Sequence, residues 1–238
     1  MNFDLSIKPL KTAKSLIPQR TLMETDVIPR HPSSVLFNGS SGSGKSTLLL
    51  NLLTRPEFYR GYFNKIYLFS PTGGSDDLFK HLKLKKDHIF SDMNPKDLRK
   101  IIDEQRAVIE KTSIDKAPRV LLIFEDVQGS KKFMNSKAFT EAFIANRHFG
   151  ASTWLCGQSF TQTPRKCRLQ ANNIFYFRGS GSEADLITQE FCPPGSNKKE
   201  FAKLLDNVTR KRYTFMHINK RAPHEVRYRS NLDKIIKF

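Results

Sequence analysis

A glycine-rich segment near the start of the chain could bind phosphate. The pattern G-x-x-x-x-G-K-[ST] is matched at every fixed position by Gly39, Ser40, Ser41, Gly42, Ser43, Gly44, Lys45 and Ser46, and Thr47 follows. An apolar run at 35–37 precedes the segment and a leucine-rich run at 48–53 follows it, as expected for a strand, a phosphate loop and a helix. The alternative, a flexible Gly/Ser linker, leaves both flanking runs unexplained.

The residue types in this segment predict a nucleotide triphosphate as the ligand. Glycines allow successive backbone N–H groups to point at phosphate oxygens, and the following helix N-terminus adds partial positive charge. We expect Lys45 to reach the β- and γ-phosphates and the Ser46 hydroxyl to ligate Mg²⁺. The predicted cofactors are therefore ATP and Mg²⁺.

Two adjacent acids follow the most apolar run of the chain. Residues 121–124 read LLIF and lead directly into Glu125 and Asp126, and ligands bind at the carboxyl ends of strands in open α/β sheets. One carboxylate would serve Mg²⁺ and the other would orient or deprotonate the attacking water. Position assigns Glu125 to the metal and Asp126 to the water, although a one-methylene difference would let them exchange roles. The alternative is an acidic turn after a core strand.

A third polar strand end completes the candidate chemistry. Gln158 follows the apolar segment 152–157. A glutamine beside a γ-phosphate can hold the lytic water or respond to the loss of the phosphate. The alternative is a solvated strand end.

The pattern of apolar segments predicts an α/β fold in one P-loop NTPase domain. Strands expected at 34–38, 64–70, 119–124, 152–157 and 173–177 alternate with helices, which favours a mostly parallel central sheet with helices on both faces. A C-terminal β-hairpin is expected from 212–218 and 226–228. We therefore predict an N-terminal arm at 1–33, an ATPase domain at 34–228 and a basic C-terminal tail at 229–238.

Charge points to a polyanionic partner. The net charge of the 238 residues is +17, and Lys and Arg outnumber Asp and Glu twelve to four over 196–238. DNA fits this excess, and a capsid or portal surface is a competing target for the C-terminal charge. The sequence has no run of transmembrane length, no signal-peptide core and no basic amphipathic helix, so no membrane contact is expected. The three cysteines form no C-x-x-C pair, which fits thiols in a reducing compartment.

Three segments together resemble one family: VLFNGSSGSGKSTLLLNLL, LLIFED and NRHFGASTWLCGQS. They resemble the viral genome-packaging ATPases of the FtsK–HerA superfamily, in particular the poxvirus-type enzymes of large DNA viruses, virophages and Polinton-like elements. The resemblance spans about residues 34–177. Glu125 stands where the family usually has Asp.

The resemblance implies a motor that moves double-stranded DNA into a preformed capsid. It implies a ring homo-oligomer, a pentamer or hexamer, and a core strand order of 5-1-4-3-2, in which the strand ending at Gln158 separates the other two site strands. It also implies a capsid or portal vertex partner and a location in the host cytoplasm or viral factory, with virion association as a further expectation. Ring motors complete each nucleotide site with a neighbour's arginine. Arg147 is our candidate, with Arg165, Arg168 and Arg178 as rivals.

Other functions compete with this interpretation. A cellular or plasmid FtsK–HerA-like DNA translocase would share the motifs but usually carries additional domains. A P-loop nucleotide kinase would share the phosphate loop but leaves the paired acids and the basic charge without a purpose. A non-enzymatic scaffold is disfavoured by intact Lys45, Ser46, Glu125 and Asp126.

Overall fold

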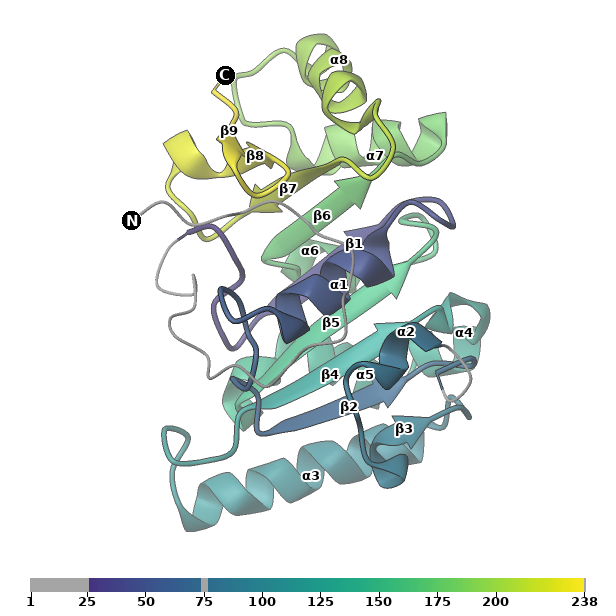
Figure 1. The fold of residues 1–238 in the computed structure, drawn as a ribbon, viewed down its shortest axis with the longest axis vertical. Coiled ribbons are helices and arrows are strands. Elements are labelled where there is room, and N and C mark those ends of the chain that lie inside the picture. Colours follow the sequence, from purple (N-terminus) through teal and green to yellow (C-terminus); the bar gives the residue numbers. More distant parts are fainter. Residues whose placement is uncertain (1–25, 74–76, 238) are drawn as a thin grey trace.

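Parallel strands form the centre of the molecule (Figure 1). The computed structural model describes residues 26–73 and 77–237, so most of the expected arm at 1–33 lies outside the described residues. Nine strands in this described part form one sheet, in the order β3-β2-β4-β5-β1-β6-β7-β8-β9. The strands are β1 Ser34–Asn38, β2 Lys65–Phe69, β3 Ile89–Phe90, β4 Val120–Glu125, β5 Ala151–Gly157, β6 Asn173–Phe177, β7 Phe215–Asn219, β8 Tyr228–Ser230 and β9 Lys234–Ile235.

The order of the core strands confirms the expected 5-1-4-3-2 arrangement. β5 pairs in parallel with β1 on one side and with β4 on the other, and β6 pairs in parallel with β1. The register aligns Asn38 with Gly157 and Glu125 with Cys156. The carboxyl ends of β1, β5 and β4 therefore meet at one edge of the sheet, where each leads into a candidate site segment.

Helices cover both faces of the sheet, as predicted for a parallel sheet that is buried on both sides. The buried side chains form two hydrophobic clusters, one on each face of the sheet. α1 and α2 contribute to one cluster, and α3 to α8 contribute to the other (Figure 1). The helices are α1 Lys45–Thr54, α2 Asp77–Lys80, α3 Pro95–Lys111, α4 Lys131–Met134, α5 Lys137–Ile144, α6 Arg165–Gln170, α7 Gly181–Phe191 and α8 Lys198–Thr209.

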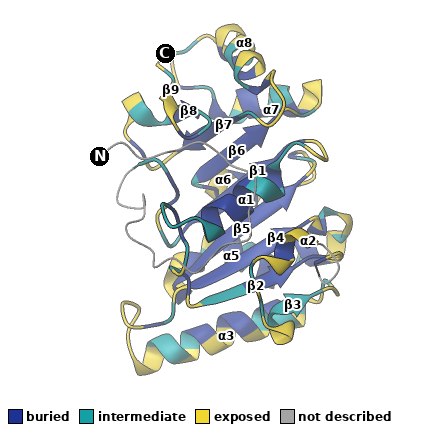
Figure 2. Ribbon diagram, in the orientation of Figure 1, coloured by how far each residue is buried: buried dark blue, intermediate teal, exposed yellow. Residues whose placement is uncertain are grey.

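The strand period of two divides the core between these faces. In β4, Leu121 and Ile123 belong to the α1 side, whereas Leu122 and Phe124 pack with the opposite cluster. Because both faces are covered, β4 has no polar face and is buried throughout, as Figure 2 shows for the central strands. A sheet buried in this way gives the site a rigid floor.

Helix α3 illustrates how local sequence sets an element. Asn94 caps the helix by accepting a hydrogen bond from the backbone N–H of Lys96, and Pro95 occupies the first helical position, where its missing N–H costs nothing. Leu98, Ile101 and Ile102 are buried against the sheet.

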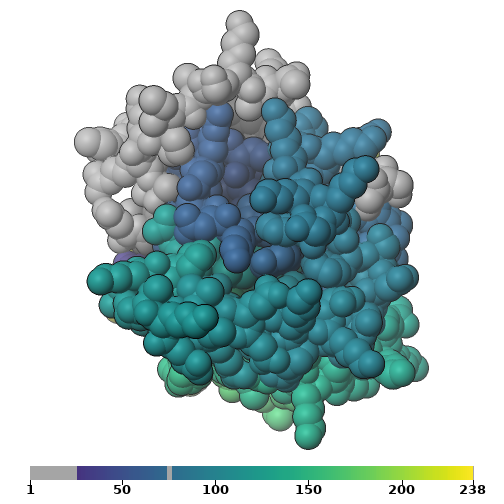
Figure 3. Space-filling view, turned by 90° about the horizontal axis from the view of Figure 1, so that it is seen from below, coloured from purple at the N-terminus to yellow at the C-terminus, as the bar shows by residue number. Residues whose placement is uncertain are grey.

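Segments from the first half of the chain, blue to teal in Figure 3, cover the end of the molecule at which β3 lies.

The C-terminal segment departs from the predicted tail at 229–238. β8 continues to Ser230, and Lys234–Ile235 forms β9 at the sheet edge. The side chain of Leu232 is fully buried, and the Asn231 side chain accepts a hydrogen bond from the backbone N–H of Phe215. One buried leucine therefore anchors the segment, which is part of the sheet rather than a tail. The predicted hairpin strands are shifted along the chain, because Tyr213 lies in a turn with a φ of 67° before β7 begins.

Within the residues that the structure describes, no helix combines the length and the apolar character needed to cross a membrane.

Candidate active site

The glycine-rich segment lies between β1 and α1. Gly39 has a φ of 155°, and a Cβ added to it would lie 2.5 Å from the Cβ of Phe177. Gly44 has a φ of 103° and directly precedes α1, in a conformation that disfavours side chains. Glycine is therefore required at Gly39 by close approach and at Gly44 by backbone geometry. The pattern G-x-x-x-x-G-K-[ST] folds here as the strand, loop and helix that phosphate binding needs.

Lys45 folds back over this loop. Its side chain is buried, and Nζ donates to the backbone oxygens of Gly39 at 2.8 Å and Ser40 at 2.9 Å. Both acceptors are neutral carbonyl groups, so the loop holds a buried positive charge that no carboxylate neutralises at those two contacts. This arrangement suits a phosphate as the counter-charge.

Ser46 and Glu125 meet although they are far apart in the sequence. Ser46 Oγ donates to Glu125 Oε1 at 2.7 Å, and Glu125 is only 6 % exposed. Burial raises the pKa of Glu125 to about 7, and the charge of Asp126 also raises this pKa. Hydrogen bonds from Ser46 and Cys156 and the charge of Lys45 act in the opposite direction. The carboxyl group is therefore held in a site that disfavours its charge.

These two residues fit a magnesium ion. The second oxygen of Glu125, Oε2, is buried and has no hydrogen-bond partner among the described residues. A hydroxyl and an unsatisfied carboxylate oxygen side by side are hard oxygen donors, and Mg²⁺ often takes only one or two protein ligands together with water and substrate phosphates. Ser46 and Glu125 would hold the ion, which when bound neutralises charge on the β- and γ-phosphates.

Asp126 and Gln158 form a second polar pair at the same sheet edge. Asp126 follows β4 with a φ of 50° and is exposed. Gln158 Nε2 donates to both carboxylate oxygens of Asp126 at 3.2 Å. The structure thus places Gln158 beside Asp126, the residue that the sequence assigned to the attacking water.

Two residues that the sequence analysis missed hold the loop after Gln158. The Gln128 amide donates to the carbonyl of Ser159 and to Thr163 Oγ1, and it accepts from the backbone N–H of Ser159. On the other side, buried Glu183 of α7 accepts from Ser159 Oγ, from the backbone N–H of Phe160 and from the hydroxyl of Thr161. The segment is therefore held from both sides. These contacts span more than 20 positions, so no local spacing could have signalled them.

The candidate arginines lie in different places. Arg147 is exposed in the turn before β5, whereas Gln158 follows the carboxyl end of that seven-residue strand, so about 20 Å separate them along the strand. Arg168 is buried and paired with Glu190 at 2.8 Å. Arg178 follows β6 beside the phosphate loop, and its carbonyl accepts from the backbone N–H of Ser40. Within one subunit, Arg147 is remote from the loop and Arg178 adjoins it. Arg165 is exposed at the start of α6.

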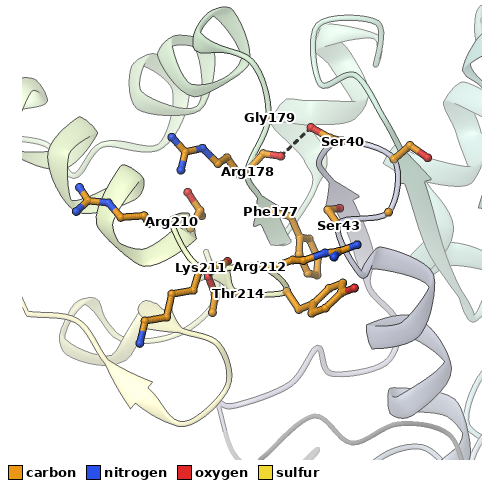
Figure 4. A pocket seen from close by; sticks show the side chains of 13 residues that line it. Ser40, Ser43, Phe177, Arg178, Gly179, Arg210, Lys211, Arg212 and Thr214 are labelled. Carbon is orange, nitrogen blue, oxygen red and sulfur yellow. Dashed lines mark hydrogen bonds between the residues drawn. The ribbon is translucent and has the colours of Figure 1, made fainter.

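A pocket of about 400 Å³ opens beside the phosphate loop (Figure 4). It is lined by residues 40–43 of the loop, residues 177–179 at the end of β6, and residues 209–214 between α8 and β7. Arg178, Arg210 and Arg212 contribute positive charge to its walls. The pocket therefore extends the phosphate site toward the C-terminal strands.

Fold and site together define a P-loop NTPase. Residues 23–223 match the model of the family described as the poxvirus A32 protein, and the chain belongs to that family. The match confirms the resemblance to viral packaging ATPases that the sequence motifs indicated.

Solved structures show the same fold. The genome packaging NTPase B204 from Sulfolobus turreted icosahedral virus 2, in complex with AMP, superposes with a TM-score of 0.60 at 16 % identity, over 84 % of this chain and 96 % of that chain. The same protein in complex with sulfate superposes with a TM-score of 0.60 at 17 % identity, over 88 % of this chain and 100 % of that chain. B204, the DNA-packaging ATPase of Sulfolobus turreted icosahedral virus, superposes with a TM-score of 0.57 at 18 % identity, over 79 % of this chain and 93 % of that chain. A search of curated protein sequences found no match.

Proposed function

We propose that this protein is an ATP-hydrolysing motor that moves double-stranded viral DNA into a preformed capsid. The single observation that carries the proposal is the convergence of Ser46, Glu125, Asp126 and Gln158 at one sheet edge beside the phosphate loop. Membership of the poxvirus A32 family and likeness in fold to a genome packaging NTPase support the same assignment.

Each site residue has a role in hydrolysis. Lys45 binds the β- and γ-phosphates, while Ser46 and Glu125 hold Mg²⁺. Asp126, steadied by Gln158, orients the water and accepts its proton as the water oxygen bonds to the γ-phosphorus. The bond from the γ-phosphorus to the bridging oxygen breaks, which yields ADP and phosphate. Gln158, which lies beside the γ-phosphate in this proposal, responds when the phosphate leaves.

Positive charge supplies the second half of the proposal. The excess of Lys and Arg at 196–238 suits contacts with DNA phosphates, which are independent of sequence and weaken with salt. A motor needs such contacts because it must hold any sequence and then release it. We expect the logarithm of DNA affinity to fall linearly with the logarithm of salt concentration. A capsid or portal vertex protein is a second proposed partner, with action in the host cytoplasm or viral factory.

The nucleotide site is proposed to be completed by a second subunit in a pentameric or hexameric ring. Because Arg147 lies at the far end of β5 from the phosphate loop, it could act only on a neighbour's nucleotide. Mixing Arg147→Ala subunits with Lys45→Ala subunits tests this role: recovered hydrolysis at mixed interfaces supports it. If Arg147→Ala alone hydrolyses ATP normally, the next candidates are Arg165, which is exposed at the start of α6, and Arg178, which adjoins the loop of its own subunit and would act there in cis.

The deciding experiment measures the ATPase rate with and without long double-stranded DNA. The motor predicts strong stimulation by long duplexes, and Lys45→Ala serves as the inactive control. Phosphate transfer from ATP to a nucleoside, without stimulation by DNA, would instead establish the nucleotide kinase. Movement of DNA without any capsid would favour a cellular or plasmid type of translocase.

A further inference from the structure

An exposed tyrosine lies directly against the phosphate loop. Tyr213 is 58 % exposed, and a Cβ added to Gly44 would lie 3.2 Å from its Cδ1 atom. Its ring therefore rests on the backbone of the loop one residue before Lys45, and it forms part of the wall of the 400 Å³ pocket. A residue that is more than half exposed contributes little to the hydrophobic core, so core packing does not account for the position of the ring.

The backbone at Tyr213 is held in an unfavourable conformation. Its φ of 67° lies in the left-handed region, which is uncommon for bulky residues and costs on the order of 1 kcal/mol or more. The turn that contains it is closed by Thr214, whose backbone N–H and hydroxyl both donate to the carbonyl of Lys211. The Asn231 side chain fixes the next residue, Phe215. The surrounding contacts thus impose this conformation, which is typical of functional sites.

The environment of the ring suits a nucleotide base. The guanidinium of Arg212 lies over the ring, 4.8 Å from its centroid, and more than half of the residue remains exposed to solvent beside the loop. The pocket joins the tyrosine to loop residues 40–43, where the phosphates would bind. A ligand with phosphates at one end and a flat aromatic group at the other matches this arrangement.

We propose that Tyr213 is the stacking platform for the base of the bound nucleoside triphosphate. This inference rests on the proposed function, because it concerns the same nucleotide site. Stacking on an aromatic side chain contributes about 1–3 kcal/mol per base, which corresponds to roughly 5- to 150-fold in affinity at 1.4 kcal/mol per factor of ten. Since every base has a π-face, the platform contributes affinity with little discrimination among bases.

The test compares ATP with inorganic triphosphate, which has the phosphates but no base. Binding of both is measured by calorimetry to the full chain, to Tyr213→Ala and to Tyr213→Phe. Alanine keeps a Cβ and therefore the same backbone cost as tyrosine, so this variant changes only the ring. Tyr213→Ala should lose roughly 5- to 150-fold in ATP affinity and none in triphosphate affinity, and Tyr213→Phe should restore ATP binding.

Three results would overturn the proposal. If Tyr213→Ala weakens ATP and triphosphate equally, the residue shapes the phosphate loop instead of contacting the base. If it weakens neither, the base binds elsewhere. If the unaltered protein binds neither ligand, the proposed function itself fails and the platform fails with it. If the unaltered protein binds both ligands and Tyr213→Ala binds ATP equally well, the platform alone is refuted.

Discussion

Replacing Glu125 with glutamine should stabilise the metal-free protein while abolishing hydrolysis. Glu125 is buried, and burial raises its pKa from 4.5 to about 7. A shift of this size, at 1.36 kcal/mol per pH unit, means that the ionised carboxylate costs the folded state about 3 kcal/mol. Glutamine keeps the acceptor for Ser46 Oγ but carries no charge. The protein therefore holds a destabilising group where the proposed chemistry needs it.

The sign of the pH dependence follows from the raised pKa. Below pH 4.5 the carboxyl group is protonated in both states and costs nothing. Between pH 4.5 and 7 the unfolded state loses its proton first, so the stability of the unaltered protein falls as pH rises. The advantage of Glu125→Gln should therefore be close to zero near pH 4.5 and reach at most about 3 kcal/mol at pH 8.

Urea unfolding in EDTA at pH 5 and pH 8 measures this difference, and the ATPase assay with Mg²⁺ measures the loss of activity. Asp126→Asn is the matched control, because Asp126 is exposed and asparagine tolerates its left-handed backbone. This variant should lose activity and show only a small part of the pH-dependent gain, because burial, the largest cause of the raised pKa of Glu125, remains when the charge of Asp126 is removed. If Glu125→Gln is no more stable at pH 8 than the unaltered protein, the buried carboxylate is not destabilising. If it hydrolyses ATP normally, Glu125 does not belong to the active site.

Three further predictions concern other parts of the fold. Burial, helped by the charge of Arg229, lowers the pKa of His217 to about 3. Below pH 6.5 the unfolded state therefore takes up a proton that the folded state does not, and the free energy of unfolding falls by about 1.4 kcal/mol per pH unit. His217→Gln should flatten this slope in urea unfolding between pH 7 and 5. Gly157→Ala would place a Cβ 2.6 Å from the amide nitrogen of Gln128 and should lower kcat roughly tenfold, the cost of about one hydrogen bond, with ATP affinity retained; an unchanged kcat would show that the Gln128 contacts do not serve catalysis. Phe124→Ala, in the fully buried core, should reduce the free energy of unfolding by about 3–5 kcal/mol in the same urea assay.

Local patterns in the sequence were sufficient to predict the core of the fold. Continuous apolar runs such as 121–124 indicated strands buried on both faces, and the structure covers both faces with helices. The strand order came from the resemblance, because no local pattern records which strands are neighbours. The end of the sheet was missed, since Leu232, Ile235 and Ile236 lie among charged residues at a spacing that does not alternate as a strand does.

The site divides in the same way. The phosphate loop was predictable because its chemistry requires fixed spacing within eight residues. The contacts of Gln128 and Glu183 were not, because they depend on the fold bringing together the turn after β4, the segment after β5 and helix α7. Tyr213 could not be predicted either, because its position against Gly44 and its left-handed backbone exist only once the turn after α8 has folded.

The middle strand explains why the site residues can meet at all. β1 and β4 are separated by β5, so about 9.6 Å lies between the strands that carry the phosphate loop and the acids. Ser46 and Glu125 nevertheless lie 2.7 Å apart, because α1 and the end of β4 approach each other past the end of β5. That end is Gly157, whose missing side chain leaves the space that Gln128 occupies, and whose carbonyl accepts from the backbone N–H of Gly39. A side chain at this one position would collide with Gln128 and disturb the segment after Gln158 that Gln128 holds, so the strand order and the glycine act as a single requirement for the site.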